Sequence, residues 1–289
     1  MKNKINHITC FLIPFIVLTS CEKDITIELQ ENVEEKIVVE GHIEAGLPPY
    51  IFLTKTMDYF APTDANTFER LYIHGADVKV YNGFRTFQLK EYCSNDVPKE
   101  LYPIAAEYLG VSIANLSDFN LCVYTLDIAN VDSANMGVAG MTYELTINVE
   151  GKTVSAVTTI LQPVPLDSLW FEEITANLGY IWVRLTDPPQ TGNHYRVFTK
   201  RQGVDEYFIP PKSSVFDDQQ INGSTVDFFI EGTFGKGDTV VVKWCTLDKA
   251  HYDFWRTAEI EIQNSGNPIA SPTLVITNIA GDAIGLPLF

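Results

Sequence analysis

The sequence has few of the residues, and none of the short motifs, on which most enzyme active sites depend. Its 289 residues include 5 histidines and 5 cysteines. They contain no His-Glu-x-x-His, Cys-x-x-Cys, Walker, Gly-x-Ser-x-Gly or EF-hand calcium motif. We therefore assign no catalytic residue, no metal ligand and no cofactor, and we expect a protein that is not an enzyme.

Basic residues are also scarce. The chain has 20 Lys and Arg against 37 Asp and Glu, a formal net charge of −17. Nucleic acids and anionic membrane surfaces bind proteins through basic patches. The composition therefore argues against nucleic acid as a partner.

Long apolar runs are missing except at the N-terminus. Lys2 and Lys4 precede an apolar stretch from Ile8 to Leu18, which is shorter than the ~20 residues needed to span a bilayer. This layout predicts a cleaved secretory signal over residues 1–20 rather than a membrane helix. Its removal would leave 18 basic and 37 acidic residues, a formal charge of −19.

The signal ends in Leu18-Thr19-Ser20-Cys21, which is typical of a lipobox. The Cys21 thiol would accept diacylglycerol, and acyl chains such as palmitate would then hold the protein to a membrane. Residues 21–34 would form the lipid anchor and a flexible tether. The alternative is an ordinary signal peptide with a chance cysteine.

The residues after Cys21 bear on its destination. Glu22-Lys23-Asp24 resembles the Lys-plus-acidic signal of surface lipoproteins in the Bacteroidota, although Ile25 stands where another acid is usual. We expect a lipid-anchored outer-membrane protein exposed at the cell surface. The periplasm-facing leaflet is the alternative.

Cys10 would leave with the signal, and the three remaining cysteines are of two kinds. Cys93 and Cys122 are the best candidates for a disulfide, because the envelope is oxidising and they bracket one excursion of the chain. Cys245 lies in an apolar run and is expected to be a buried free thiol.

Short alternating runs with turn signals predict a mainly β protein. Asn82-Gly83 and Glu150-Gly151 indicate two hairpins, and Gln162-Pro163-Val164-Pro165 interrupts the pattern. We expect two tandem antiparallel β-sandwiches of the immunoglobulin or transthyretin type, over residues 35–161 and 166–289.

Two helical segments are predicted within this β pattern. A helical insertion covers residues 94–121, where Leu101, Ile104, Ala105 and Tyr108 have helical spacing. Because of Pro103, two short pieces are an alternative to one continuous helix. A second helix covers residues 249–263 and follows the N-cap Asp248. Its aromatic face is expected to pack on the second sandwich.

Several weaker candidates remain for sites. Asp217 and Asp218 could form a cation or ligand loop, or a solvated turn. Ser133 and Ser168 lie in Asp-Ser-apolar triplets that resemble O-glycosylation sites of exported Bacteroidota proteins. Trp182 lies in the middle of a predicted strand and is expected in the core.

The chain resembles a family of Bacteroidota lipoproteins known only as a domain of unknown function. Short segments carry the resemblance in order along the mature chain: Val38–Gly41, Gly75–Val78, Gly140–Tyr143, Asp167–Leu169, Asp187–Pro188, Gly237–Val240, Tyr252–Trp255, Gly266–Pro268, Ser271–Pro272 and Asn278–Ile279. Ile269 departs from the Phe usual in the family. The resemblance implies a partner, because such proteins are often companions of TonB-dependent transporters, but it brings no site residues.

Together these observations favour a non-catalytic outer-membrane lipoprotein that serves a TonB-dependent uptake system as an accessory or ligand-binding subunit. One alternative is a surface hydrolase that cleaves glycans through a carboxylate pair. A second alternative is a structural or adhesive envelope protein.

Overall fold

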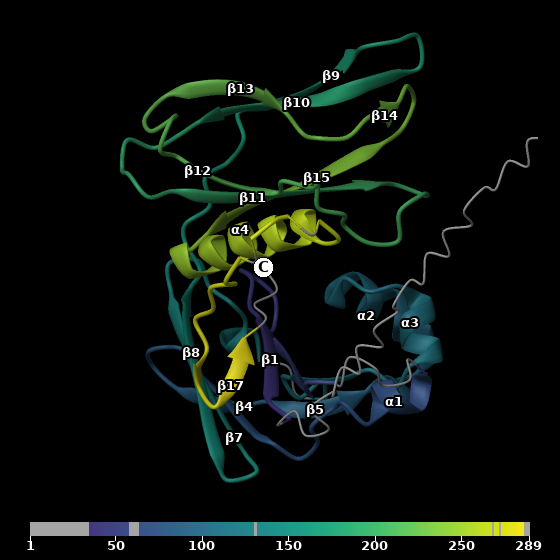
Figure 1. Ribbon diagram of the computed structural model, residues 1–289, viewed down its shortest axis with the longest axis vertical. Helices are drawn as coiled ribbons and strands as arrows, with labels where there is room; N and C mark the ends of the chain where they lie inside the picture. The colour runs from purple at the N-terminus through teal and green to yellow at the C-terminus, as the bar shows by residue number, and fades with distance from the viewer. Residues whose placement is uncertain (1–34, 58–63, 130–131, 268, 272, 286–289) are drawn as a thin grey trace, which may run out of the picture. The chain divides into compact units, whose positions relative to one another are not determined.

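The computed structural model describes residues 35–57, 64–129, 132–267, 269–271 and 273–285. The predicted signal, Cys21 and the tether over residues 21–34 lie outside the described residues. The described chain is mainly β, with strands arranged in several antiparallel sheets (Figure 1). None of its helices within these ranges is long and apolar enough to cross a membrane.

The first sandwich consists of two five-stranded sheets. One has the order β17-β1-β2-β6-β5 and the other the order β16-β8-β7-β3-β4. Their strands are β1 (Ile37–His42), β2 (Tyr50–Lys55), β3 (Asp77–Tyr81), β4 (Thr86–Gln88), β5 (Lys90–Cys93), β6 (Cys122–Thr125), β7 (Thr142–Val149), β8 (Lys152–Thr159), β16 (Ala280–Gly281) and β17 (Ala283–Gly285). Alternate residues such as Val39, Leu53 and Ile147 fill the core between the two sheets.

Both predicted hairpins form in this sandwich. Glu150 and Gly151 join β7 to β8 with positive φ angles of 52° and 75°, as a tight primed turn requires. Between β3 and β4 the Asn82 Oδ1 accepts hydrogen bonds from the backbone N–H groups of Phe84 and Arg85. The turn chemistry therefore fixes the register of both strand pairs.

The predicted insertion forms short helical pieces between β5 and β6. They are η1 (Ser94–Asp96), η2 (Lys99–Leu101), α2 (Tyr102–Leu109) and α3 (Ile113–Asp118). Pro103 occupies the first turn of α2, and Gly110 ends that helix with a φ of 66°. Ser112 then caps α3 by accepting a hydrogen bond from Asn115 N. Another short helix, α1 (Ala65–Glu69), lies between β2 and β3.

The insertion packs on the face of β1, β2 and β6 that points away from the sandwich core. Tyr50, Phe52 and Val123 of the sheet form a cluster there with Tyr102 and Leu109 of α2. Both faces of these strands are therefore covered. For this reason β2 is buried at four consecutive positions instead of alternating.

The second sandwich has a sheet with the order β13-β10-β14, in which β9 also pairs with β10, and a sheet with the order β12-β11-β15. Its strands are β9 (Ser168–Glu173), β10 (Leu178–Thr186), β11 (His194–Arg201), β12 (Val215–Asp217), β13 (Thr225–Phe229), β14 (Phe234–Gly235) and β15 (Val240–Leu247). Val183, Val197, Ile230 and Trp244 contribute to its core. Trp182 belongs to the opposite face of β10, where its ring stacks on that of Trp170, so its expected core position was wrong.

Helix α4 (Lys249–Asn264) follows the second sandwich. It starts where Asp248 accepts a hydrogen bond from His251 N, as predicted for its N-cap. The ring of Tyr252 in the helix lies against that of His194 in β11, with centroids 4.5 Å apart, and its hydroxyl donates a hydrogen bond to Asp217 of β12. An aromatic face thus attaches α4 to this sheet.

The C-terminal strands do not join the second sandwich. Ala283–Gly285 pairs in parallel with β1, and Ala280–Gly281 pairs with β8. The predicted range of the second sandwich, 166–289, therefore has to be corrected, because backbone pairing places 280–285 in the first one. Strands this short carry too little hydrophobic pattern to reveal their partners.

Candidate ligand-binding site

A disulfide closes the helical insertion at its base. Cys93 of β5 and Cys122 of β6 are directly opposite each other and are bonded, which confirms the predicted pair. Closing a loop of about 30 residues contributes about 3 to 4 kcal/mol in the chain-entropy model. The bond therefore fixes both ends of the insertion to the sheet that it covers.

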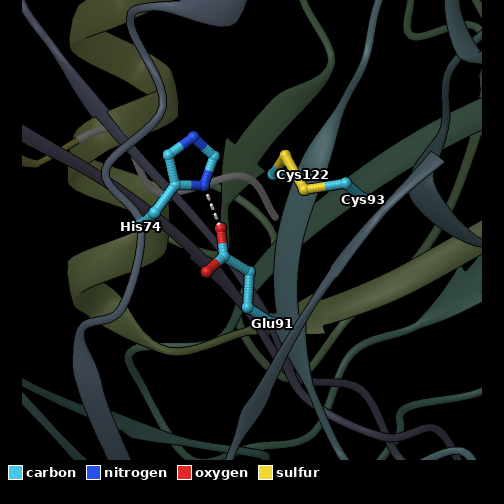
Figure 2. A group of neighbouring side chains, drawn as sticks. All are labelled: His74, Glu91, Cys93 and Cys122. Carbon is cyan, nitrogen blue, oxygen red and sulfur yellow. Dashed lines mark hydrogen bonds and ion pairs between the residues drawn. A yellow bond between two sulfur atoms is a disulfide. The ribbon is translucent and has the colours of Figure 1, made fainter. Parts of the chain in front are cut away.

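His74 and Glu91 lie beside this disulfide, and potential ligand atoms of all four residues lie within 4.8 Å of one another (Figure 2). His74 Nδ1 is 2.5 Å from Glu91 Oε1. Metal binding by cysteine requires thiolates, and the sulfurs of Cys93 and Cys122 are bonded to each other. Only an imidazole and a carboxylate remain, so this group does not form a metal centre.

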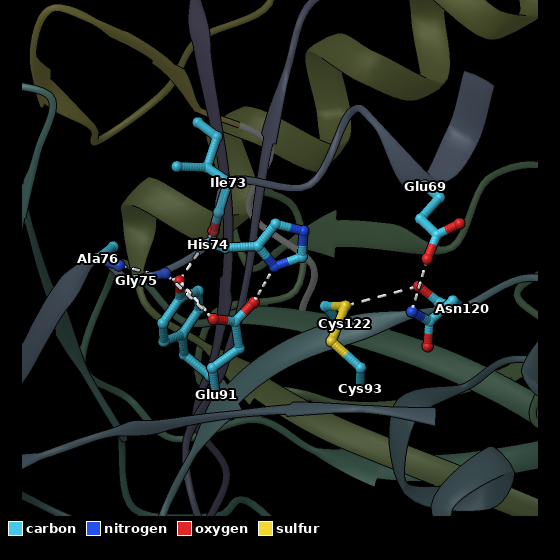
Figure 3. Close-up of polar contacts among 10 residues, drawn as sticks. Glu69, Ile73, His74, Gly75, Ala76, Glu91, Cys93, Asn120 and Cys122 are labelled. Carbon is cyan, nitrogen blue, oxygen red and sulfur yellow. Dashed lines mark hydrogen bonds and ion pairs between the residues drawn. A yellow bond between two sulfur atoms is a disulfide. The ribbon is translucent and has the colours of Figure 1, made fainter. Parts of the chain in front are cut away.

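The Glu91 carboxylate instead holds a neighbouring segment in place. Its Oε2 accepts a hydrogen bond from Gly75 N at 3.1 Å (Figure 3). The same oxygen lies 3.3 Å from Tyr124 Oη. The Tyr124 hydroxyl lies 2.8 Å from Ile73 O, and this closer acceptor takes its proton. The Cys122 Sγ, which carries no hydrogen in the disulfide, only contacts Asn120 O at 3.6 Å.

A cavity of about 450 Å³ opens between the insertion and strands β5 and β6. We call it the insertion cavity. Its walls are almost entirely apolar. They comprise Leu47, Pro48, Tyr92, Cys93, Ser94, Val97, Leu101, Tyr102, Ile104, Ala105, Tyr108, Leu109, Leu116, Leu121, Val123, Thr125, Leu126 and Ile128.

The hydroxyl groups in these walls are bonded to the protein itself. Tyr102 Oη donates to Ser94 O at 3.0 Å, and Thr125 Oγ1 donates to Pro49 O at 2.7 Å. Tyr92 donates to Asp127 Oδ1, and Tyr108 donates to Pro48 O. Because these protons are already used, the cavity offers a ligand chiefly apolar contact.

The mouth of the cavity is apolar as well. Ile104 is 69% exposed, Ile128 54% and Leu101 44%. Exposed apolar groups around an apolar cavity are typical of a binding site.

The predicted helical spacing found Leu101, Ile104, Ala105 and Tyr108, but α2 buries Tyr102, Ala106 and Leu109 most deeply. The sequence analysis therefore missed the cavity, although the largely apolar composition of α2 was a usable signal.

The predicted carboxylate pair, Asp217 and Asp218, is held by separate donors. Asp218 is 3% exposed and accepts hydrogen bonds from Gly192 N and Asn193 N at 2.8 and 3.0 Å. Asp217 Oδ2 accepts from Tyr252 Oη at 2.8 Å. Each carboxylate therefore joins a different pair of structural segments, and this geometry does not support their joint action in hydrolysis.

One group has the composition of a hydrolase triad: Asp248, His251 and Thr158. However, both neighbours contact the same ring nitrogen, since His251 Nδ1 lies 2.8 Å from Asp248 Oδ1 and 3.3 Å from Thr158 Oγ1. A proton relay uses the two different ring nitrogens. The group instead joins the start of α4 to β8, because Thr158 Oγ1 also donates to Asp248 Oδ2.

The remaining predicted residues lie apart from the insertion cavity. Ser133 starts a short helix, η3 (Ser133–Asn135), and Ser168 starts β9; both are exposed. Their O-glycosylation stays a prediction. Cys245 is half-buried, and burial raises its pKa to about 11, which disfavours the thiolate that a nucleophile needs.

The fold and cavity define a two-sandwich β protein with a helix-covered face that contains an apolar cavity. Residues 22–286 match the family described as a domain of unknown function, DUF4249, and the chain belongs to that family. Comparison with curated proteins gives no match. A solved segment of two fibronectin type III domains from chicken tenascin is 12% identical, and the match covers 74% of this chain and 92% of that one at a TM-score of 0.20.

Proposed function

We propose that the protein is a non-catalytic lipoprotein of the bacterial outer membrane, exposed at the cell surface, which binds an apolar ligand in the insertion cavity. It would serve as an accessory subunit of a TonB-dependent uptake system. The observation that carries the binding role is the apolar cavity of about 450 Å³. The lipobox at Cys21 supports the membrane anchor, and the resemblance to lipoproteins that accompany such transporters supports the partner.

The properties of the cavity favour a hydrocarbon-rich ligand. Its volume lies within the range of roughly 300 to 1,000 Å³ that is common for small-molecule sites. Apolar surface removed from water contributes about 25 cal/mol per Å², whereas the hydroxyl groups of the walls are already hydrogen-bonded to the protein. An acyl chain or another apolar group fits this chemistry better than a sugar, which needs many hydrogen bonds.

A substitution that fills the cavity tests the binding role. Ala105 lines the cavity on α2, whereas Ala114 lies exposed on α3 and outside the cavity walls. The fluorescent apolar probe N-phenylnaphthylamine should bind the unmodified protein and be displaced by dodecanol. Ala105→Phe should weaken probe binding by about tenfold or more, equivalent to about 1.4 kcal/mol, and Ala114→Phe should not. Equal binding by both variants would contradict the proposal.

The anchor and the partner need their own tests. Cys21→Ser removes the thiol that would accept the lipid, so the variant should leave the membrane fraction while the unmodified protein stays in it. A mild detergent extract should yield the unmodified protein together with a TonB-dependent transporter. Purification without any transporter would refute the accessory role, and it would leave the cavity result unaffected.

A further inference from the structure

A second cavity lies against the same sheet, on the side of α1 and α3. Its volume is about 430 Å³. We call it the Glu40 cavity, after the acidic residue in its wall. Its lining includes Glu40, Phe52, Phe68, Tyr72 and Phe119.

Glu40 reaches this cavity because of strand alternation. Val39 points into the sandwich core, so Glu40 belongs to the opposite face, where it pairs across the strands with Phe52. Among the described residues, no hydrogen-bond donor or cation lies within bonding distance of its carboxylate. Glu40 is half-buried, and a carboxylate that is largely withdrawn from water is usually paired.

The charged groups on the neighbouring elements do not neutralise Glu40. Arg70, which follows α1, donates to Thr67 Oγ1 at 3.2 Å. Glu69 accepts from Asn120 at 3.0 Å, and Asp118 of α3 is exposed. Of the tyrosines on the adjoining strand segments, Tyr50 and Tyr72 have their pKa values raised by burial first and by the charge of Glu40 among the further causes.

Burial raises the pKa of Glu40 to about 7, and no neighbouring charge contributes to this shift. The carboxylate is therefore partly ionised near neutral pH while it has no cation beside it. A cation bound in the cavity would pair with this carboxylate in surroundings of low dielectric constant, where charge pairing is strong.

Aromatic rings supply the second part of the chemistry. Phe52, Phe68, Tyr72 and Phe119 line the cavity, and the rings of Phe68 and Phe119 meet edge to face at 5.4 Å. Aromatic faces attract organic ammonium groups, and they do so more strongly when water is excluded. The same rings also accommodate an apolar substituent.

We propose that the Glu40 cavity binds an organic cation, with its ammonium group beside Glu40 and its apolar part among the aromatic rings. This site is separate from the insertion cavity and does not depend on the proposed function. Among the described residues, a lone carboxylate without a second acid beside it provides neither the carboxylate pair of a glycosidase nor the oxygen ligands of a Ca²⁺ site.

Calorimetric titration of the full-length protein tests this proposal with three compounds at about pH 8, where Glu40 is ionised. Phenylbutylamine is a primary ammonium ion, benzyltrimethylammonium is a quaternary one, and phenylbutanol is neutral. At least one cation should bind about tenfold or more tightly than the alcohol. Its affinity should fall as the pH is lowered below 7, because protonation of Glu40 removes the charge that attracts it.

Two variants distinguish the effect of the Glu40 charge on cation binding from the effect of the protein's overall negative charge. Glu40→Gln should reduce the affinity for the cation by about tenfold, whereas Glu144→Gln, at an exposed position of β7, should leave it unchanged. Binding of only the primary amine would identify a hydrogen-bonded ammonium group, and binding of only the quaternary ion an aromatic cage. Cations that bind no better than phenylbutanol, or with an affinity independent of pH between about 6 and 8, would overturn the proposal even if Glu40→Gln failed to fold.

Discussion

Acidic residues in the interior of the second sandwich have hydrogen-bond partners, whereas Glu40 on the helix-covered face of the first sandwich has none among the described residues. In the second sandwich, Asp218 accepts two backbone hydrogen bonds, and Asp187 accepts bonds from Tyr195 Oη and Gly223 N. In the first, Glu40 faces a cavity with no partner among the described residues. The paired acids hold loops and strands in place, whereas the unpaired acid is available to a ligand.

The two regions also differ in the chemistry of their cavities. The second sandwich packs Trp244 against Tyr195, Phe216 and Phe228, and charged side chains such as Asp227 and Arg256 help to line its cavity of about 640 Å³. The helical insertion, whose ends are joined by the disulfide, instead covers the sheet of the first sandwich and has a cavity on each side. Binding is therefore expected on the face whose helices are an addition to the sandwich.

Removal of the disulfide should have the largest effect and should act on the insertion. The double variant Cys93→Ala and Cys122→Ala should lower the free energy of unfolding by about 3 to 4 kcal/mol. It should also weaken binding of N-phenylnaphthylamine. Chemical denaturation measures the first quantity, and Cys245→Ala serves as the control. A loss below about 1 kcal/mol in the free energy of unfolding would contradict a stabilising role of the disulfide in the insertion.

The Glu40→Gln variant should stabilise the protein in a defined pH range. The pKa of Glu40 is about 7 in the fold against an ordinary value of 4.5, so the folded protein holds a proton that the unfolded chain releases. Stability contributed by this proton is present below about 4.5 and is lost as the pH rises through about 7. The variant should therefore match the unmodified protein near pH 4 and exceed it by about 3 kcal/mol above pH 7. A constant difference across this range would rule out the buried carboxylate as its cause.

Asp218→Ala in the second sandwich should lower the stability of the protein, whereas Glu40→Gln should raise it. Without the carboxylate, the N–H groups of Gly192 and Asn193 lose their acceptor, and the free energy of unfolding should fall by about 2 kcal/mol. Ligand binding in the first sandwich should not change. The matched variant Asp118→Ala, at an exposed position of α3, should alter stability by less than about 0.5 kcal/mol. Equal losses in the two variants would contradict a structural role for Asp218.

The smallest effect is expected at His74. Its side chain is 54% exposed, and its pair with Glu91 is therefore screened by solvent. His74→Ala should change the free energy of unfolding by less than about 1 kcal/mol. The oxidised protein should show no zinc binding in a calorimetric titration with or without this substitution. Zinc binding that depends on His74 would reverse our interpretation of the group beside the disulfide.

Much of the fold could be predicted from local chemistry. Gly83 and Gly151 adopt the positive φ angles that glycine tolerates in turns, and Asp248 caps α4. Cys93 and Cys122 could be paired because few cysteines remain once the N-terminal ones are set aside. The C-terminal strands could not be placed, since their pairing with β1 and β8 depends on backbone contacts between distant segments.

Much less of the candidate site could be predicted from the sequence. Trp182 was expected in the core because it lies in the middle of a strand, but alternation places it on the opposite face of β10, beside Trp170. The sequence analysis did not single out Glu40, because nothing in the sequence shows that an insertion covers its face of β1. A cavity depends on how α2 and α3 rest on the sheet, and helical periodicity does not determine that distance.

Methyl NMR during a titration with dodecanol tests the central claim most directly, because it observes both regions at once. The account predicts shifts for Ile104, Leu109 and Ile128, which line the insertion cavity. It predicts none for Val183 and Leu185, which are fully buried in the second sandwich. Shifts centred on the second sandwich, or no saturable shift in either region, would contradict the account.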